Sequence, residues 1–156
     1  MSETKNQVEL RELTNDNFIG VMNLEVSENQ KKFVAPNSVS MAVCHFSKYA
    51  TMRGIFLADE PIGFMMLADP VSGEEEFNGM YFLWRLMIDK NHQGKGYGKA
   101  ALKLILEYVR NRPDADYLYS SYEPGEFGPE NFYLEKMGFE KTEKMLGDEI
   151  MIRTKL

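Results

Sequence analysis

The sequence has one cysteine, two histidines and no long apolar run. A single cysteine excludes an internal disulfide, and Cys44 follows Met41-Ala42-Val43, so we expect it to be buried in a structural role. No apolar stretch reaches the roughly 18 residues that a membrane-crossing helix requires, and the amino-terminal residues lack the apolar segment of a signal peptide. We therefore expect a cytoplasmic protein with no membrane partner.

Basic residues are also in the minority. There are 18 Lys and Arg against 24 Asp and Glu, a formal net charge of -6, which argues against a nucleic acid partner and is compatible with a cationic substrate. His45 and His92 each lack a second ligand at a useful spacing, so we expect no metal site. With 156 residues, of which 44% are apolar, the chain predicts a single domain over 1–156.

Apolar patterning and turn residues predict an alternation of strands and helices. The third predicted helix has one apolar face, formed by Ala101, Leu104, Ile105 and Tyr108. The predicted strands cover 8–13, 52–58, 62–68, 80–88, 117–121, 139–146 and 149–154. The predicted helices run from Asn15 or Asp16 toward Glu25, over 38–49, from near Gly98 to Arg110, and from Pro129 to Met137, and 69–78 is a polar loop.

A glycine-rich run, Gln93-Gly94-Lys95-Gly96-Tyr97-Gly98-Lys99, lies between the strand at 80–88 and the following helix. Glycines let backbone N–H groups converge on an anion, and a helix amino terminus with nearby lysines favours phosphate. The spacing fits neither a dinucleotide fingerprint nor a P-loop. The alternative is a plain flexible turn, but that would not explain why Gln93, Lys95 and Lys99 cluster around the glycines.

The run resembles the acetyl-CoA loop of the GNAT superfamily of N-acetyltransferases, Gln/Arg-x-x-Gly-x-Gly/Ala, and the later Met137-Gly138-Phe139 turn supports the likeness. The resemblance implies an α/β (α+β) fold with a mixed, mostly antiparallel central sheet, flanked by helices and splayed at the acetyl-CoA site. It also implies acetyl-CoA as the acetyl donor and no metal. The implied cofactor-binding residues are Leu86, Met87, Ile88, Gln93, Gly94, Lys95, Gly96, Tyr97, Gly98 and Lys99, with a backbone N–H near Met87 polarising the thioester carbonyl.

The resemblance also implies a tyrosine that protonates the leaving thiolate, four residues before the Gly-Phe turn. Here that position is Leu134, and Tyr133 precedes it. Either one inserted residue leaves the Tyr133 hydroxyl in place, or a shift of about 100° around the helix turns it away. We favour the insertion, because Phe132-Tyr133 resembles the hydrophobic-Tyr pair of the family. For the general base, Glu25 and Glu28 are the candidates.

Several short segments resemble the bacterial spermine/spermidine acetyltransferases of the superfamily, which implies a primary amine acceptor, with a polyamine first. Trp84 and the carboxylates of Glu25 and Glu28 would contact it. The segments are Leu24-Glu25-Val26, Asn29-Gln30, 33–37, Leu83-Trp84-Arg85 and 121–125, and further carboxylates lie at 74–76 and at Asp148. Another small amine, a protein amino group, a non-catalytic acetyl-CoA sensor or an interaction protein stay open. A homodimer is common among the proteins that the chain resembles.

Overall fold

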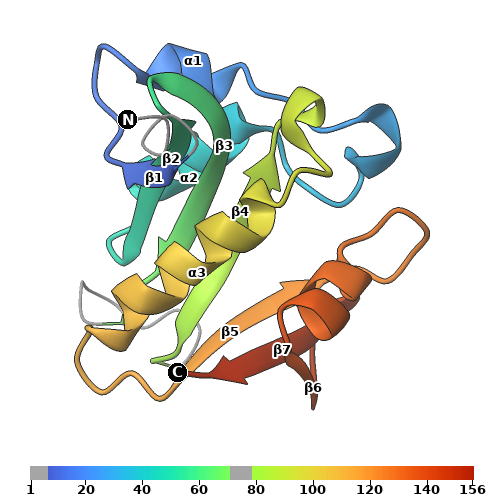
Figure 1. The fold of residues 1–156 in the computed structure, drawn as a ribbon. Helices are drawn as coiled ribbons and strands as arrows, with labels where there is room; N and C mark the ends of the chain where they lie inside the picture. The colour runs from blue at the N-terminus through green and yellow to red at the C-terminus, as the bar shows by residue number, and fades with distance from the viewer. Residues whose placement is uncertain (1–6, 71–78) are drawn as a thin grey trace.

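The computed structural model describes residues 7–70 and 79–156, and the glutamates at 74–76 lie outside the described residues. Seven strands form one sheet in the order β1-β2-β3-β4-β5-β7-β6, in which β4 and β5 run parallel and the other neighbours run antiparallel (Figure 1). The strands are β1 Val8–Arg11, β2 Ala50–Leu57, β3 Glu60–Ala68, β4 Tyr81–Ile88, β5 Tyr117–Tyr122, β6 Glu140–Leu146 and β7 Glu149–Lys155.

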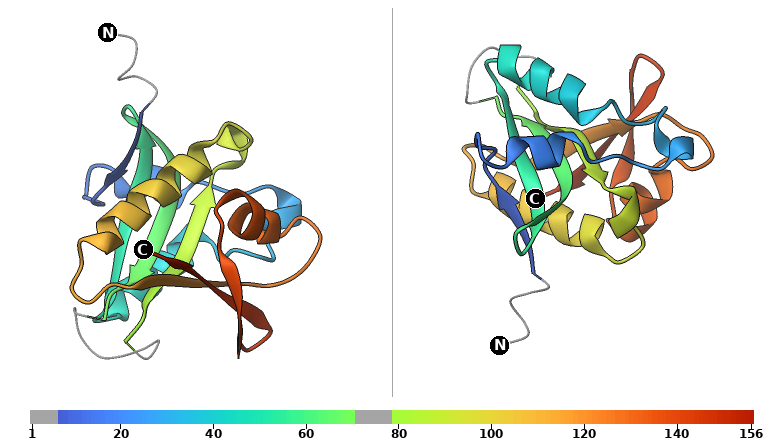
Figure 2. Two further views of the ribbon diagram at one scale, coloured as in Figure 1. Left: turned by 60° about the horizontal axis from the view of Figure 1, so that its bottom comes forward. Right: turned by 90° about the horizontal axis from the view of Figure 1, so that it is seen from above.

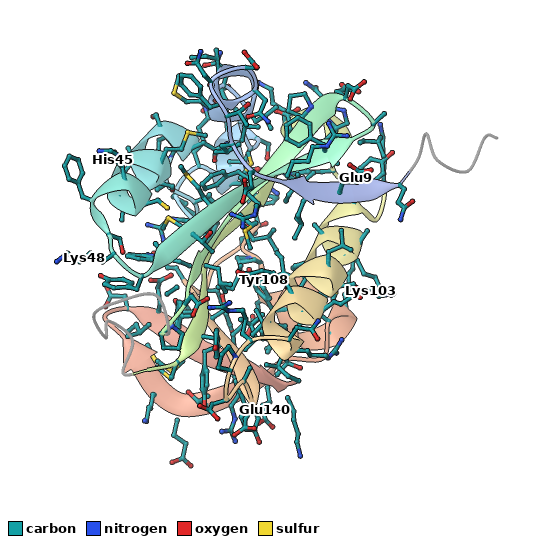
Figure 3. The ribbon with its side chains drawn as sticks, turned by 90° about the vertical axis from the view of Figure 1, so that its left-hand side faces the viewer. Glu9, His45, Lys48, Lys103, Tyr108 and Glu140 are labelled. Atoms are coloured by element: carbon teal, nitrogen blue, oxygen red, sulfur yellow. The ribbon has the colours of Figure 1, made fainter. Side chains whose placement is uncertain are left out.

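Helices cover both faces of this sheet. Helix α3 (Tyr97–Arg110) lies across one face, and α1 (Phe18–Met22) and α2 (Asn37–Phe46) lie on the other (Figure 2). Seen from the side, His45 of α2 and Lys103 of α3 lie on opposite sides of the strands (Figure 3). Short turns complete the chain: η2 (Glu28–Gln30) and η3 (Lys90–His92) are 3-10 turns, and η4 (Phe132–Lys136) is a π-helix. The predicted mixed α/β fold is confirmed.

The core follows from burial on both faces of the central strands. In β3, all residues from Ile62 to Ala68 are buried, which explains why this strand reads as a continuous apolar run. On α3, the buried face contains Ala101 and Ile105 as expected, but its other members are Leu102, Leu106 and Val109. Tyr108 is 37% exposed, so the apolar face predicted from Leu104 and Tyr108 is rotated from the one that packs.

Most differences from the predicted elements are at their ends. Helix α1 has only five residues and stops well before Glu25, and the chain then forms η2, which the sequence did not predict. Helix α2 ends at Phe46, three residues before the predicted end. The β2–β3 turn is tighter than expected, since β3 already begins at Glu60 and Ala58 adopts a positive φ of 54°.

Candidate active site

Strands β4 and β5 separate part of the way along their length. They pair at Tyr81 with Leu118, at Phe82 with Tyr119 and at Leu83 with Ser120, and the register ends there. At this last pair the Ser120 hydroxyl donates a 2.9 Å hydrogen bond to the Leu83 carbonyl. Beyond it the two strands diverge, which is the splay expected at the cofactor site.

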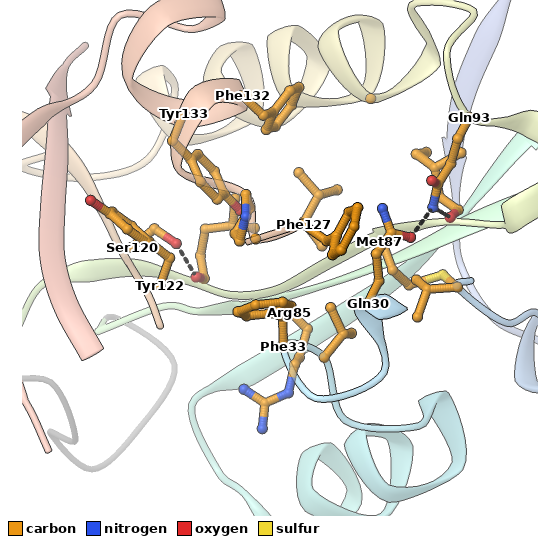
Figure 4. A pocket seen from close by; sticks show the side chains of 18 of the residues that line it. Gln30, Phe33, Arg85, Met87, Gln93, Ser120, Tyr122, Phe127, Phe132 and Tyr133 are labelled. Carbon is orange, nitrogen blue, oxygen red and sulfur yellow. Dashed lines mark hydrogen bonds between the residues drawn. The ribbon is translucent and has the colours of Figure 1, made fainter. Parts of the chain in front are cut away.

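The divergence opens a cleft of about 960 Å³ between the strands (Figure 4). Its walls include most of the residues predicted to contact the cofactor. Lys95 is the exception: its Nζ lies 3.5 Å from the Asn91 carbonyl, outside the lining. The predicted residues that line the cleft are Leu86, Met87, Ile88, Gln93, Gly94, Gly96, Tyr97, Gly98, Lys99, Trp84 and Tyr133.

The backbone of β4 presents polar groups to the cleft. The N–H of Asp89 donates to the carbonyl of Ile62 in β3, at 2.8 Å, so Asp89 faces β3. Because the backbone groups of successive residues in an antiparallel strand point alternately to opposite sides, those of Met87 also face β3, and those of Leu86 and Ile88 face the cleft. The edge of β4 therefore offers donors and acceptors to an extended ligand on either side of Met87.

A β-bulge lies where the cleft begins. Met66 of β3 pairs with Arg85 and Leu67 pairs with Leu83, so Trp84 is the additional residue on β4. Trp84 stacks on Tyr49 with ring centroids 6.4 Å apart, and the Arg85 guanidinium lies 5.9 Å from the Trp84 ring. Burial lowers the pKa of Arg85, and the charge of Glu149 opposes this shift. Trp84, Arg85 and Glu149 together line one end of the cleft.

The glycine loop lies at the other end of the cleft. Gly94 and Gly96 adopt positive φ angles of 75° and 83°, and a Cβ atom on either would meet open space. Glycine is thus required here by the left-handed backbone. The first bond of α3 runs from the Ala100 N–H to the Gly96 carbonyl, so the preceding N–H groups of the first turn have no partner within the helix. With Lys99 beside them, these N–H groups are suited to bind an anion.

Gln93 connects three parts of this site. Its Nε2 donates to the Ile88 carbonyl at the end of β4 and to Oε1 of Gln30 in η2, both at 2.9 Å. Oε1 of Gln30 also accepts from the Ser27 N–H at 3.3 Å. The glutamine of the loop motif therefore holds the start of the loop against β4 and the α1–α2 segment.

Tyr133 lies on the side of the cleft formed by Ser120 (Figure 4). It is 6% exposed, and burial raises its pKa to about 12, with the nearby Ser120 side chain acting in the opposite direction. Tyr133 is part of the π-helix, in which the Met137 N–H donates to the Phe132 carbonyl at 3.0 Å. A π turn contains one residue more than an α turn. It can therefore accommodate an inserted residue without rotating the preceding turns about the helix axis.

Glu25 and Glu28 do not line the cleft. Glu25 forms an ion pair of 3.5 Å with Lys90, and Glu28 forms one of 2.6 Å with Lys31. Both carboxylates are exposed. The acidic residues in the lining are instead Glu123, after β5, and Glu149, at the start of β7.

Sequence reasoning gave no individual role to several residues of the cleft. Gln30, Phe33 and Glu123 occurred only within segments of family resemblance, and Phe127 and Glu149 were not singled out. The Gly125-Glu126-Phe127-Gly128 run was one available signal in the sequence, since it places an aromatic residue between two glycines. In the structure, Phe127 adopts a positive φ of 66° and is 57% exposed. Residues with such a strained backbone are typical of functional sites.

Two features are absent from residues 7–70 and 79–156. No helix in these ranges is long and apolar enough to cross a membrane. In the same ranges, no group of three or more His, Cys, Asp and Glu residues is placed to hold a metal ion.

Comparisons with known proteins agree with this geometry. The acetyltransferase (GNAT) family matches residues 10–139, and the chain belongs to this family. Over 103 residues it is 30% identical to the probable spermine N(1)-acetyltransferase of Bacillus subtilis subsp. natto and 29% identical to the spermine/spermidine N(1)-acetyltransferase of Bacillus subtilis, covering 65% of this chain and 68% of each relative. The fold matches AAC(6')-Ib in complex with ribostamycin and coenzyme A, with a TM-score of 0.75, 17% identity, and 96% and 94% of the two chains covered.

Proposed function

We propose that this GNAT protein transfers the acetyl group of acetyl-CoA to a primary amine, with a polyamine as the acceptor. The observation that carries the proposal is the cleft between β4 and β5, which joins a loop suited to an anion at one end to an end lined by Trp84, Arg85 and Glu149 at the other. A ligand with phosphates and a long extended arm matches the first end. An ammonium group on an alkyl chain matches the second.

In this proposal the pyrophosphate lies on the loop from Gly94 to Lys99, at the amino terminus of α3. The helix end favours an anion by about 0.3 to 1 kcal/mol, and Lys99 adds a cationic donor. The pantetheine arm then runs along β4, where the backbone groups of Leu86 and Ile88 face the cleft. A backbone N–H of this edge, beside Met87, polarises the thioester carbonyl as negative charge develops on its oxygen.

Tyr133 is the proposed general acid. The amine nitrogen forms a bond to the carbonyl carbon, the carbon–sulfur bond breaks, and the leaving sulfur takes the proton of the Tyr133 hydroxyl. The proton that the nitrogen loses as the amide forms then returns Tyr133 to its protonated state. A pKa of about 12 keeps this hydroxyl protonated at neutral pH, so the proton is available. The π turn supports the assignment, because it accommodates the additional residue that separates Tyr133 from the Gly138 turn.

The acceptor must lose a proton before it attacks. For an amine with an ordinary pKa near 10.4, the neutral form costs roughly 4.6 kcal/mol at neutral pH. We propose that Glu123 and Glu149 hold the acceptor's ammonium groups and pass the proton to water, since they line the cleft, whereas Glu25 and Glu28 do not line it and are paired with Lys90 and Lys31. Trp84 contacts the alkyl chain of the acceptor.

The choice of a polyamine is supported by the relatives' names at about 30% identity and by the two carboxylates of the lining. The test is thiol release from acetyl-CoA by the purified protein, supplied separately with spermidine, spermine, a diamine, ribostamycin and a lysine peptide. We expect saturable release with the polyamines and an acetylated product by mass spectrometry. Thiol release with another amine alone would identify that amine as the acceptor in place of a polyamine. Acetyl-CoA binding without thiol release for any amine would indicate a sensor.

A further inference from the structure

The cleft is enclosed by a ring of contacts, of which two parts are already described. At the closed end of the divergence, the Ser120 hydroxyl bonds to Leu83 and joins β4 to β5. At the far end of β4, Gln93 bonds to both Ile88 and Gln30, and so attaches the α1–α2 segment to that strand. The remaining opening of the ring lies between this segment and the loop that follows β5.

Phe33 closes this opening. Its N–H donates to the Gln30 carbonyl at 2.9 Å, which holds Phe33 next to η2. Its ring packs on two glycines of the loop after β5. A Cβ atom at Gly125 would lie 3.0 Å from the ring, and one at Gly128 would lie 3.2 Å from it. A side chain at either position would require the ring to shift by a few tenths of an ångström. Both views of Figure 2 show the two segments side by side.

The same loop places a second aromatic side chain at the cleft. The Gly128 N–H donates to the Gly125 carbonyl at 3.1 Å, and this turn holds Phe127 with its positive φ of 66°. The Phe127 ring lines the cleft although it is 57% exposed (Figure 4). The wall opposite β4 therefore carries two aromatic rings at the point where the ring of contacts closes, and the Lys32 ammonium lies 4.9 Å from the centroid of the Phe33 ring.

Resting on the proposed acetyl transfer, we propose that Phe33 determines acceptor specificity. By packing against Gly125 and Gly128, the Phe33 side chain completes the ring of contacts around the cleft. The cleft then becomes a channel that admits a primary amine at the end of a slender, unbranched alkyl chain. We expect an aminoglycoside, whose amines lie on a six-membered ring or one carbon away from it, to be too wide to pass between Phe33 and β4. The contact between Phe33 and the glycines is van der Waals only, so removing the ring opens the channel without breaking a side-chain hydrogen bond.

The test compares spermidine with ribostamycin as acceptors for the wild-type protein and for Phe33→Ala. We expect the wild type to prefer spermidine, and Phe33→Ala to reduce the ratio of the two kcat/KM values by at least about tenfold, mainly through a gain with ribostamycin. Phe46→Ala is the matched control, because it removes the same ring from a position that is 84% exposed and outside the cleft. It should leave the ratio unchanged.

Two results would overturn the inference while the proposed function stands. One is equal use of both acceptors by the wild type, and the other is an unchanged ratio in Phe33→Ala. Acetyl-CoA affinity and circular dichroism, measured on each variant, establish that the protein is folded, and Phe33→Leu, which keeps part of the ring's volume, should give an intermediate ratio. If neither amine releases thiol from the wild type, the proposed function fails and the inference fails with it.

Discussion

The Ser120 hydroxyl donates a 2.9 Å hydrogen bond to the carbonyl of Leu83, at the last rung that joins β4 to β5. Ser120 is 2% exposed, and its side chain also acts on the pKa of Tyr133. One serine therefore connects the point where the sheet opens with the hydroxyl proposed as the general acid. In the proposed mechanism, this link keeps the Tyr133 hydroxyl at the point where the cleft begins.

Replacing Tyr133 with Phe removes the proposed acid and keeps the ring. We expect kcat for thiol release to fall by about 100-fold, within the range for general acids, while acetyl-CoA affinity is unchanged. Tyr81→Phe is the matched control, because Tyr81 is also buried but its hydroxyl bonds to the Pro113 carbonyl outside the cleft. Steady-state kinetics with calorimetric binding would contradict the assignment if kcat in Tyr133→Phe matched that in Tyr81→Phe.

The pH dependence of the free energy of unfolding at alkaline pH should reflect the raised pKa of Tyr133. Burial raises the pKa values of Tyr133 and Tyr122 to about 12, from an ordinary value of 10.0, and Glu130 adds to the shift of Tyr122. The folded state holds these protons more tightly than the unfolded state, so the stability they contribute is complete below the unfolded pKa and is lost as pH rises through the folded pKa. Urea unfolding should show a falling free energy of unfolding across this window, with a smaller slope in Tyr133→Phe. Equal slopes would contradict the shift.

Gly96 should be needed both for the fold and for the cofactor. Alanine at a positive φ costs about 1 to 2 kcal/mol, so Gly96→Ala should lower the free energy of unfolding and weaken acetyl-CoA binding as the loop rearranges. Gly147, in the turn between β6 and β7, has a φ of 58° and does not line the cleft. Gly147→Ala should lose similar stability and keep its affinity for acetyl-CoA. Equal affinities in the two variants would argue against phosphate binding at this loop.

Gln93 should act by positioning the loop. Gln93→Ala loses hydrogen bonds to both Ile88 and Gln30, whereas Gln30→Ala leaves the bond to Ile88 intact. We therefore expect the dissociation constant for acetyl-CoA to rise by about tenfold in Gln93→Ala, equivalent to about 1.4 kcal/mol, and by less in Gln30→Ala. Isothermal titration gives both values. A larger effect in Gln30→Ala would contradict this order.

The sequence predicted those parts of the fold that depend on local pattern. The glycines from Gly94 to Gly98, between an apolar strand and an amphipathic helix, identified the loop, and the order of elements was correct. Helix ends were less accurate, because tertiary contacts decide them: α1 stops at Met22 and η2 follows. On α3, the apolar spacing allowed two neighbouring faces, and packing on the sheet selected the one that contains Leu102 and Val109.

The remaining parts of the site depend on contacts between distant segments. Phe33 meets Gly125 and Gly128 only after the sheet has formed, and no local pattern announces that contact. The count back from Gly138 could not decide between an inserted residue and a rotated Tyr133, since both give the same sequence. The π-helix is a backbone feature that a residue count does not show. The bulge at Trp84 likewise becomes visible only in its pairing with β3.

The most direct test is a crystal structure of the protein with bound coenzyme A. We predict that the pyrophosphate contacts the loop from Gly94 to Lys99, that the pantetheine arm lies between β4 and β5, and that the sulfur lies within hydrogen-bond reach of the Tyr133 hydroxyl. Coenzyme A bound outside this cleft, or bound within it with the sulfur directed away from Tyr133, would contradict the account.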